Sequence, residues 1–363
     1  MNDFFEIDFL DVDSNKSGDA ITLRYKVNGK THIHVVDGGF QDTGDKVIEH
    51  INKYFDKVQT IDRVIVTHSD GDHAGGLRKV LEEFKVRELW MLRPWIYAGE
   101  LIDRFTRFSS VANLSKRLKE IYPNLTALEE IASQKGIVIY EPFQGNRIGE
   151  FTVMAPTKSR YLDVIVESEK TPEAESGKEK LLGKSISDIL EKGAAKVMKL
   201  IRAAWGEEIF SDEETNAENE MSVIQYANIC GKRILLTGDA GRAGLKEAAD
   251  YAPFAGLLLP GIDRFQVSHH GSRRNVSTEI LDKWLGKRLQ SKPEKGQEKF
   301  TTIISASKKD EDHPRKAVVR ALIHRGAKVV TTEGASLNTS HNAPERSGWV
   351  AATPLEYPET QEE

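Results

Sequence analysis

The sequence predicts an α/β fold, and three observations lead to this class. Residues 64–67 form a β-branched run that is typical of a buried strand, and apolar residues at helical spacing begin directly after Gly76. Other short apolar runs alternate with amphipathic stretches over most of the chain. The 363 residues are 39% hydrophobic and 29% charged, so they can bury a large core, as one α/β domain with insertions or as two smaller domains.

The expected strands and helices follow one another along the chain, with two interruptions. Strands are predicted over residues 4–10, 20–27, 32–36, 64–67, 86–92, 136–141, 151–155, 221–228, 233–237, 266–268, 301–306 and 328–332, and helices over 46–55, 77–84 and 316–325. Helical insertions are expected from about 95 to 135 and from about 157 to 219, the second with a helix at 186–205, in a domain of residues 1–340. Residues 341–363 are expected to pack as an irregular extension whose last few residues are disordered.

The overall charge and the cysteine content exclude several classes of protein. The formal net charge is only -5, which is neither that of a nucleic-acid coat nor that of a membrane-surface protein. The single cysteine, Cys230, excludes an internal disulfide and a zinc site built from several thiolates. No apolar run approaches the roughly 18 residues that span a bilayer, and the N-terminus has no basic region, so we expect a cytoplasmic protein without a membrane partner.

Four potential metal ligands lie together in the turn that follows residues 64–67. They are His68, Asp70, Asp72 and His73, two imidazoles and two carboxylates within six positions. A turn between a strand and a helix can direct such side chains to one point without help from distant parts of the fold. The alternative is a polar loop in which Asp72 caps the following helix. A cap needs one such residue, whereas this turn supplies four, so a metal site is favoured.

Further acids and histidines stand where other strands end. Asp37 ends an apolar strand before two glycines, which is the position of an active-site or supporting residue; an aspartate in a plain turn is the alternative. Asp239 follows Gly238 at the end of a predicted hairpin strand. His269 and His270 end the next strand, where neighbouring side chains point to opposite faces, so only one of them is expected to reach a metal.

These motifs resemble those of the metallo-β-lactamase superfamily. The similarity runs through residues 9–12, 18–20, 36–39, 67–73, 236–240, 268–272 and 313–314, which together span most of the chain apart from the helical insertions. More narrowly, the motifs resemble the nuclease-type domain of the DNA-uptake channel protein ComEC and its stand-alone soluble relatives. The resemblance implies an αββα sandwich with a two-metal site along one edge of the sheets.

The resemblance also implies which residues hold the metals. Carried over by position, the implied set is His68 and Asp70 on one ion, Asp72 and His73 on the second, Asp239 as the bridge, His269 with His270 beside it completing the second site, and Asp37 as the supporting acid. Most of the superfamily has a histidine in place of Asp70, and a further histidine where this chain has Asn219, Glu220 and Ser222; we expect Asn219 and Ser222 to support the ligands. Because oxygen donors replace imidazoles, Mn²⁺ or Mg²⁺ is favoured as the cofactor, with Zn²⁺ possible.

Two divalent ions suit the hydrolysis of a phosphodiester. Held roughly 3.5 to 4 Å apart, they lower the pKa of a bridging water, orient the hydroxide and stabilise charge on the attacking and leaving oxygens. We expect Asp72 and His270 to take part in this chemistry beside the metals. His313 is the candidate general acid for the leaving oxygen, and a turn histidine before Pro314 is the alternative.

Basic residues near these motifs are candidates for binding phosphate. Ser272, Arg273 and Arg274 directly follow the histidine pair, and Lys308 lies shortly before His313; a surface role for the two arginines is the alternative. The helical stretch that starts near residue 95 adds cations that either flank a substrate cleft or form a solvated face: Arg93, Arg104, Arg107, Lys116 and Arg117.

The sequence therefore predicts a two-metal hydrolase whose expected substrate is DNA or another nucleic acid. The first alternative is a small-molecule hydrolase that uses the same metals on an ester, thioester, lactam or cyclic nucleotide. A nuclease needs a basic track several nucleotides long, which separates the two hypotheses. The second alternative is a non-catalytic scaffold, although nearly all expected ligand positions are filled. The insertion at 157–219 is a candidate surface for a protein partner. The other interpretations are a lid over the site and an insertion without a function of its own.

Overall fold

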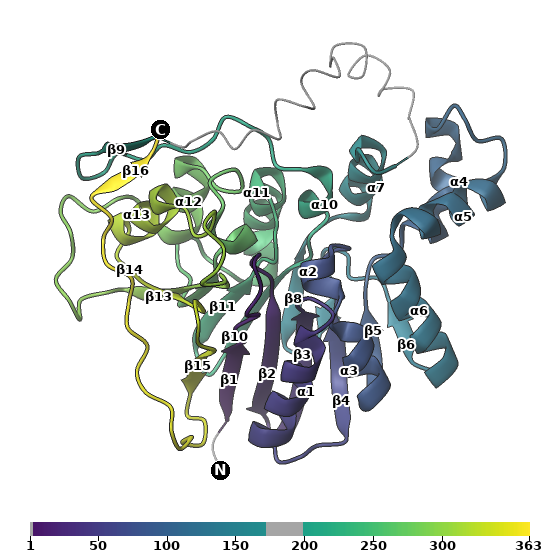
Figure 1. Cartoon of the computed structure of the whole chain (residues 1–363), viewed down its shortest axis with the longest axis horizontal. Helices are drawn as coiled ribbons and strands as arrows, with labels where there is room; N and C mark the ends of the chain where they lie inside the picture. Colours follow the sequence, from purple (N-terminus) through teal and green to yellow (C-terminus); the bar gives the residue numbers. More distant parts are fainter. Residues whose placement is uncertain (1–2, 172–198) are drawn as a thin grey trace.

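The computed structural model describes residues 3–171 and 199–363 of the chain. Two seven-stranded sheets pack against each other, and helices cover their outer faces (Figure 1). A single buried apolar cluster joins Phe5 and Ile7 of one sheet to Val153, Ile234 and Ile303 of the other. The predicted α/β class, with two sheets between layers of helices, is confirmed.

The first sheet has the strand order β15-β1-β2-β3-β4-β5-β6. Its strands are β1 (Phe4–Phe9), β2 (Ala20–Val27), β3 (Lys30–Gly38), β4 (Thr60–Ile65), β5 (Lys85–Trp90), β6 (Val138–Tyr140) and β15 (Leu337–His341). From β3 to β6 the neighbouring strands are parallel, and the other pairs are antiparallel. The helix α1 (Thr43–Tyr54) connects β3 to β4, and α2 (Gly71–Ala74) and α3 (Leu77–Glu83) connect β4 to β5.

The second sheet has the strand order β14-β13-β12-β11-β10-β8-β7. Its strands are β7 (Arg147–Ile148), β8 (Phe151–Ala155), β10 (Ile224–Ile229), β11 (Lys232–Leu236), β12 (Arg264–Gln266), β13 (Phe300–Ile304) and β14 (Ala327–Thr331). The strands from β11 to β14 are parallel. A second apolar cluster, which includes Leu245, Trp284 and Leu322, packs α11 (Arg242–Tyr251), α12 (Thr278–Leu285) and α13 (Lys316–His324) onto this sheet.

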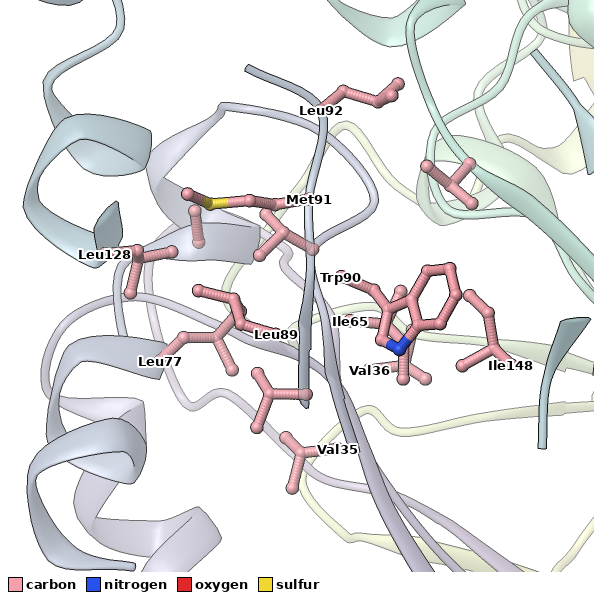
Figure 2. Close-up of a cluster of buried hydrophobic side chains, with 14 of the residues drawn as sticks. Val35, Val36, Ile65, Leu77, Leu89, Trp90, Met91, Leu92, Leu128 and Ile148 are labelled. Carbon is pink, nitrogen blue, oxygen red and sulfur yellow. The ribbon is translucent and has the colours of Figure 1, made fainter. Parts of the chain in front are cut away.

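Side chains of the first sheet alternate between its two faces, as the geometry of a strand requires. Figure 2 shows Val35 and Leu89 on the side of Leu77 from α3, whereas Ile65 and Trp90 lie on the side of Ile148 from the second sheet. All of these side chains are buried. Both faces of the sheet are therefore apolar around these residues.

The two expected insertions differ in how much of them the structure describes. The first contains the turns η1 (Pro94–Tyr97) and η2 (Ile102–Arg104) and the helices α4 (Ala98–Leu101), α5 (Val111–Ile121) and α6 (Pro123–Lys135). The second contributes α7 (Lys158–Glu167), β9 (Leu200–Arg202) and α10 (Ala217–Glu220) within the described residues. The helix expected at 186–205 lies partly outside the described residues. Its described end is wrong, because residues 200–202 form β9.

The end of the chain also differs from the expectation of a disordered tail. Thr360–Glu362 forms β16, which pairs antiparallel with β9. This pairing of distant segments overrides the local sequence pattern at both places. The division into a domain of residues 1–340 and an extension stays a prediction. Across residues 3–171 and 199–363, no helix is long and apolar enough to cross a membrane.

Candidate metal centre

The ends of several strands bring acids and histidines to one edge of the sandwich. Asp37 lies at the end of β3, and His68 lies shortly after β4, which is parallel to β3. Asp239 follows β11, and His270 follows β12, which is parallel to β11. Because the carboxyl ends of parallel strands meet at the same edge, these side chains gather although they lie far apart in the sequence.

Three overlapping groups of potential ligands contain His73, and two of them are made of predicted metal ligands. In the first, ligand atoms of His68, His73 and Asp239 all lie within 4.8 Å of one another. In the second, the same holds for Asp72, His73 and His270. Apart from Asp72, which is partly exposed, these residues are buried. The donors are imidazole nitrogens and carboxylate oxygens, which suit Zn²⁺ and Mn²⁺.

Each of the three buried histidines uses its Nδ1 atom for a hydrogen bond. His73 donates from Nδ1 to Asp37 Oδ2 (2.8 Å), and His270 donates to the carbonyl of Ser305 (2.8 Å). The Thr67 hydroxyl donates to Asp37 Oδ2 (2.6 Å), so its oxygen is free to accept from His68 Nδ1 (3.0 Å). With the proton on Nδ1, each ring presents the lone pair of Nε2 to the centre.

The Nε2 atoms of His68, His73 and His270 are buried and have no hydrogen-bond partner within the described part of the chain. The same is true of Asp239 Oδ1, which lies 3.2 Å from His73 Nε2. Two acceptors that face each other in this way are costly unless a cation lies between them. The residues therefore fit a bound metal ion.

The charges of the centre also favour a cation. Burial alone would raise the pKa of Asp239. The neighbouring imidazoles of His73, His269 and His270 lower this pKa by more, so the net pKa is well below its ordinary value and the carboxylate stays ionised. Burial lowers the pKa of His73, but Asp239 and Asp37 raise it well above its ordinary value. For His270 the opposing effects of burial and of Asp239 leave the pKa at about 9. The cluster thus attracts positive charge, either protons or a metal.

Asp37 organises the first two strand ends. It is fully buried and has a positive φ of 57°. Besides His73, it accepts the Thr67 N–H (2.8 Å), so it ties β3 to the turn that carries His68. The glycine after it allows a close approach, because a Cβ at Gly38 would lie 2.7 Å from the Leu77 nitrogen at the start of α3. This arrangement is compatible with the supporting role predicted for Asp37, which stays a prediction.

The structure places His270, rather than His269, in the group with Asp72 and His73. Both histidines lie in a tight turn after β12, with φ of 47° and 54°, so the alternation expected along a strand does not separate them. His269 Nδ1 lies 2.8 Å from Asn219 Nδ2 and 3.0 Å from Asn275 Oδ1. Its Nε2 is 3.6 Å from Asp239 Oδ2, at the margin of the centre.

The other predicted ligand and the supporting polar residues lie around this group. Asp70 Oδ2 is 3.9 Å from His68 Nε2, and Asp70 Oδ1 forms an ion pair with Lys170 (2.8 Å). The Asp239 N–H donates to the Ser222 hydroxyl (3.2 Å), which fixes the backbone of the proposed bridging residue. Asn219 contacts His269, as described above. Asn219 and Ser222, the two residues expected to support the ligands, therefore both lie near the centre.

Sequence reasoning assigned no role to Asp19, which belongs to the centre. Asp19 is buried, forms a ligand group with Asp239 and His270, and lies 3.7 Å from His73 Nδ1. Its Oδ2 accepts from Gln266 (2.8 Å), whereas its Oδ1 has no partner among residues 3–171 and 199–363. The signal available was its position at residues 18–20, one of the motifs that carry the resemblance.

A cavity of about 610 Å³ opens beside the centre. Its lining includes His269, Ser272, Arg273, Arg274 and His313. The structure therefore brings together the predicted general acid and three of the predicted phosphate-binding residues. Lys308 is exposed and is not part of this lining.

His313 is held by an acid that the sequence analysis did not select. Asp310 Oδ2 lies 3.2 Å from His313 Nδ1 and also accepts the N–H (2.9 Å) and hydroxyl (2.8 Å) of Ser17. Burial raises the pKa of Asp310, but these hydrogen bonds lower it to about 2. Burial and the charges of His270 and His269 lower the pKa of His313 to about 4. The ionised Asp310 binds the Nδ1 edge of the His313 imidazole, and His313 also lines the cavity.

The cations of the first helical stretch are largely engaged with acids. Arg93 pairs with Glu141 (2.7 Å) and Glu129 (3.2 Å). Arg104 pairs with Asp163 (2.9 Å), and Arg117 pairs with Glu120 (3.1 Å). Lys116 is exposed. These pairs reduce the positive charge that this stretch offers to a nucleic acid.

Comparison with known proteins supports the broad class. Residues 24–137 match the model of the Metallo-beta-lactamase superfamily. Similar solved structures are a hydrolase named AbOPH in the beta lactamase superfamily (11% identity, TM-score 0.28, 61% of this chain) and a Beta-lactamase domain protein from Burkholderia ambifaria (12%, 0.28, 68%). This chain covers 56% and 65% of those two chains. No curated protein matches.

The chain thus resembles the metallo-β-lactamase superfamily over residues 24–137, a class whose members are typically hydrolases. Its fold, with two sheets between helices, is consistent with that class. The narrower likeness to the ComEC nuclease domain stays a prediction.

Proposed function

We propose that this chain is a metal-dependent phosphodiesterase and that its substrate is DNA or another nucleic acid. One observation carries the proposal: buried Nε2 atoms of His68, His73 and His270 that lack partners within the described residues converge next to a cavity lined by Arg273 and His313. Ligands for cations and a group that binds anions stand side by side. Hydrolysis of a charged phosphodiester needs both.

The proposed assignment of ligands combines the two groups with Asp70, which lies 3.9 Å from His68 Nε2. We assign His68 and Asp70 to one ion, Asp72, His73 and His270 to a second, and Asp239 to both, with His269 at the margin. When bound, divalent ions act as Lewis acids that polarise a phosphoryl oxygen and acidify water. The number of carboxylates favours Mn²⁺ or Mg²⁺, with Zn²⁺ as the alternative.

The remaining residues have distinct roles in this proposal. Ser272 binds a non-bridging oxygen of the phosphate under attack through its hydroxyl group, and Arg273 binds another anionic group of the substrate through its guanidinium. The imidazolium form of His313 donates its Nε2 proton to the leaving oxygen; because the pKa of His313 is about 4, this form is a minor one at neutral pH and a strong acid. Asp310 keeps the His313 ring in place through Nδ1, so Nε2 is available to the substrate.

A second candidate is a hydrolase of small phosphate esters or other small esters. The cavity volume of about 610 Å³ falls within the range of sites for small molecules, roughly 300 to 1,000 Å³. In addition, the ion pairs of Arg93 and Arg104 leave less free positive charge for a long nucleic acid. Both observations favour a compact substrate.

The test uses metal-stripped full-length protein resupplied separately with Mn²⁺, Mg²⁺ or Zn²⁺. Cleavage is measured on single- and double-stranded DNA and on bis(p-nitrophenyl) phosphate. We expect Mn²⁺ to restore cleavage, Asp72→Asn to lower the rate about a thousandfold, and the control Asp250→Asn, which removes an exposed carboxylate on α11, to leave it unchanged. Metal binding without cleavage of either substrate class would overturn the proposal. Cleavage of the small phosphodiester alone would favour the second candidate.

A further inference from the structure

One wall of the cavity beside the metal centre is built by segments that lie far apart in the sequence. Lys199, directly before β9, and Glu363, directly after β16, both line the cavity that also holds His269, His313 and Arg273. Figure 1 shows β9 and β16 side by side at the edge of the molecule near α13. We call the pair β9–β16 with Lys199 and Glu363 the terminal wall.

The terminal wall is anchored to the body of the protein. Gln361 is buried, and its side-chain oxygen accepts the N–H of Ile209 (3.1 Å). The Glu362 carboxylate accepts the N–H groups of Lys316 and Ala317, both at 2.9 Å, at the first turn of α13. A carboxylate at a helix N-terminus is stabilising. Since the loop with His313 leads directly into α13, the wall and His313 share one support.

Arg273 stands between the wall and the centre. Its carbonyl accepts the Ser211 N–H (3.2 Å) and the Arg242 Nη2 (3.3 Å), which fixes its backbone. Its Nη2 donates to the backbone oxygen of Glu363 (3.3 Å). Its Nη1 is buried and has no hydrogen-bond partner in residues 3–171 and 199–363. A buried guanidinium donor of this kind favours an anionic oxygen as its partner.

Neighbouring cations of the cavity have acidic partners of their own. Lys199 pairs with the Glu363 carboxylate (2.9 Å), and Arg274 pairs with Glu213. Arg315 pairs with Asp312 (2.8 Å). The cavity therefore offers a concentrated anion site at Arg273 rather than a continuous basic track of the kind that binds long single strands.

We propose that the terminal wall makes this site selective for phosphodiester bonds next to a chain end, with Arg273 binding the terminal phosphate. This inference rests on the proposed phosphodiesterase function. Because Lys199 and Glu363 line the same cavity as His313, we expect the wall to obstruct a strand that continues past His313 in both directions and to admit a strand that ends there. The proposal thus names the substrate class as nucleic acid ends and short fragments.

The experiment compares substrates with and without ends. A linear single-stranded oligonucleotide, carrying a phosphate at its 5′ or its 3′ end, is compared with a closed circle of the same sequence, in the presence of Mn²⁺. We expect the linear form with one of the two phosphates to be cleaved about tenfold faster than the circle. Equal rates on the linear and circular forms would overturn the inference. Bis(p-nitrophenyl) phosphate is assayed in parallel, and its lack of hydrolysis marks failure of the proposed function instead.

Variants distinguish the effect of the terminal wall on substrate choice from general effects of a substitution on the fold. The double variant Lys199→Ala, Glu363→Ala removes exposed side chains and leaves the anchors Gln361 and Glu362 in place. We expect it to raise cleavage of the circle relative to the linear form. Arg273→Ala is expected to raise KM for the preferred phosphorylated end about tenfold more than KM for bis(p-nitrophenyl) phosphate, which has no terminal phosphate. Arg87→Ala, an exposed arginine on β5, is the control. Unchanged ratios in both test variants would also overturn the inference.

Discussion

The candidate metal centre and the cluster around Glu208 are both buried and both combine histidine with carboxylate, but their histidines are bonded differently. In the Glu208 cluster, His324 uses both ring nitrogens: Nδ1 lies 3.0 Å from Glu208 Oε1, and Nε2 lies 3.0 Å from the Tyr357 hydroxyl. In the metal centre, His68, His73 and His270 form hydrogen bonds through Nδ1 only, as far as the described residues show.

This difference separates a structural cluster from a functional one. Glu208 also accepts from Arg325 (2.6 Å) and from Thr278 (2.6 Å), so its buried charge is compensated. Unsatisfied buried polar atoms each cost about 1–3 kcal/mol. A protein retains them where a ligand supplies the missing partner. We therefore expect substitutions in the Glu208 cluster to lower stability, and substitutions in the metal centre to lower metal binding and activity.

The largest effect is expected from Glu208→Gln. The substitution removes one of the two carboxylates that pair with the guanidinium of Arg325, which is 1% exposed, and leaves Asp282 as the other. Loss of one partner of a buried ion pair typically costs about 3–5 kcal/mol. Urea denaturation measures the loss, and the activity per folded molecule is expected to stay at the wild-type level. A stable but inactive variant would contradict the separation of the two clusters.

A part of the same stabilisation is expected to depend on pH. Burial raises the pKa of Glu208, but hydrogen bonds from His324 and Arg325 lower it to about 2, from an ordinary value of 4.5. Because the folded pKa is depressed, the stabilisation is complete above about pH 4.5 and is lost as the pH falls toward 2. The difference in unfolding free energy between wild type and Glu208→Gln should therefore narrow below pH 4.5. A constant difference from pH 5.5 to 3 would show that the charge of Glu208 is not the cause.

Asp37→Asn is expected to have a moderate effect on the metal centre. The amide can still accept from Thr67, but its nitrogen cannot accept the Nδ1 proton of His73. Loss of such a supporting partner lowers metal affinity about 10- to 100-fold. Calorimetric titration of Mn²⁺ into metal-stripped protein measures the change. The neighbouring exposed residue Asp42 offers a control, Asp42→Asn, for which unchanged affinity is expected.

The smallest effect is expected from Arg104→Ala. The ion pair of Arg104 with Asp163 is solvent-exposed, and pairs of this kind contribute about 0–1 kcal/mol. We expect a change below about 0.5 kcal/mol in unfolding free energy and no change in the binding of single-stranded DNA. A tenfold loss of DNA affinity would instead place the first helical stretch on the path of a long substrate.

Local patterns explain which parts of the fold and of the site the sequence predicts. The helix expected after Gly76 is confirmed as α3, which begins at Leu77, because apolar spacing and the flanking glycines act within a few residues. The grouping of His68, Asp72 and His73 is similarly local, since one turn carries all three. The edge at which Asp239 joins them follows from the direction of parallel strands.

Contacts between distant segments explain what the sequence does not predict. Asp19 is held at the centre by a hydrogen bond from the Gln266 side chain, and no local sequence pattern links these two residues. The preference for His270 over His269 depends on positive φ values in a turn, whereas strand alternation was the rule available from sequence. β9 and β16 form only because residues 200–202 and 360–362 meet in the folded chain.

The most direct test of the central claim is metal binding by wild type, Asp239→Asn and Glu208→Gln, measured by calorimetric titration of Mn²⁺ and Zn²⁺ into metal-stripped protein. We predict that wild type binds two ions, that Asp239→Asn binds them at least about tenfold more weakly while keeping its resistance to urea, and that folded Glu208→Gln binds like wild type. Wild-type affinity in Asp239→Asn would contradict the assignment of the cluster of His68, His73, His270 and Asp239 as a metal centre. The absence of metal binding by the wild-type protein would contradict it as well.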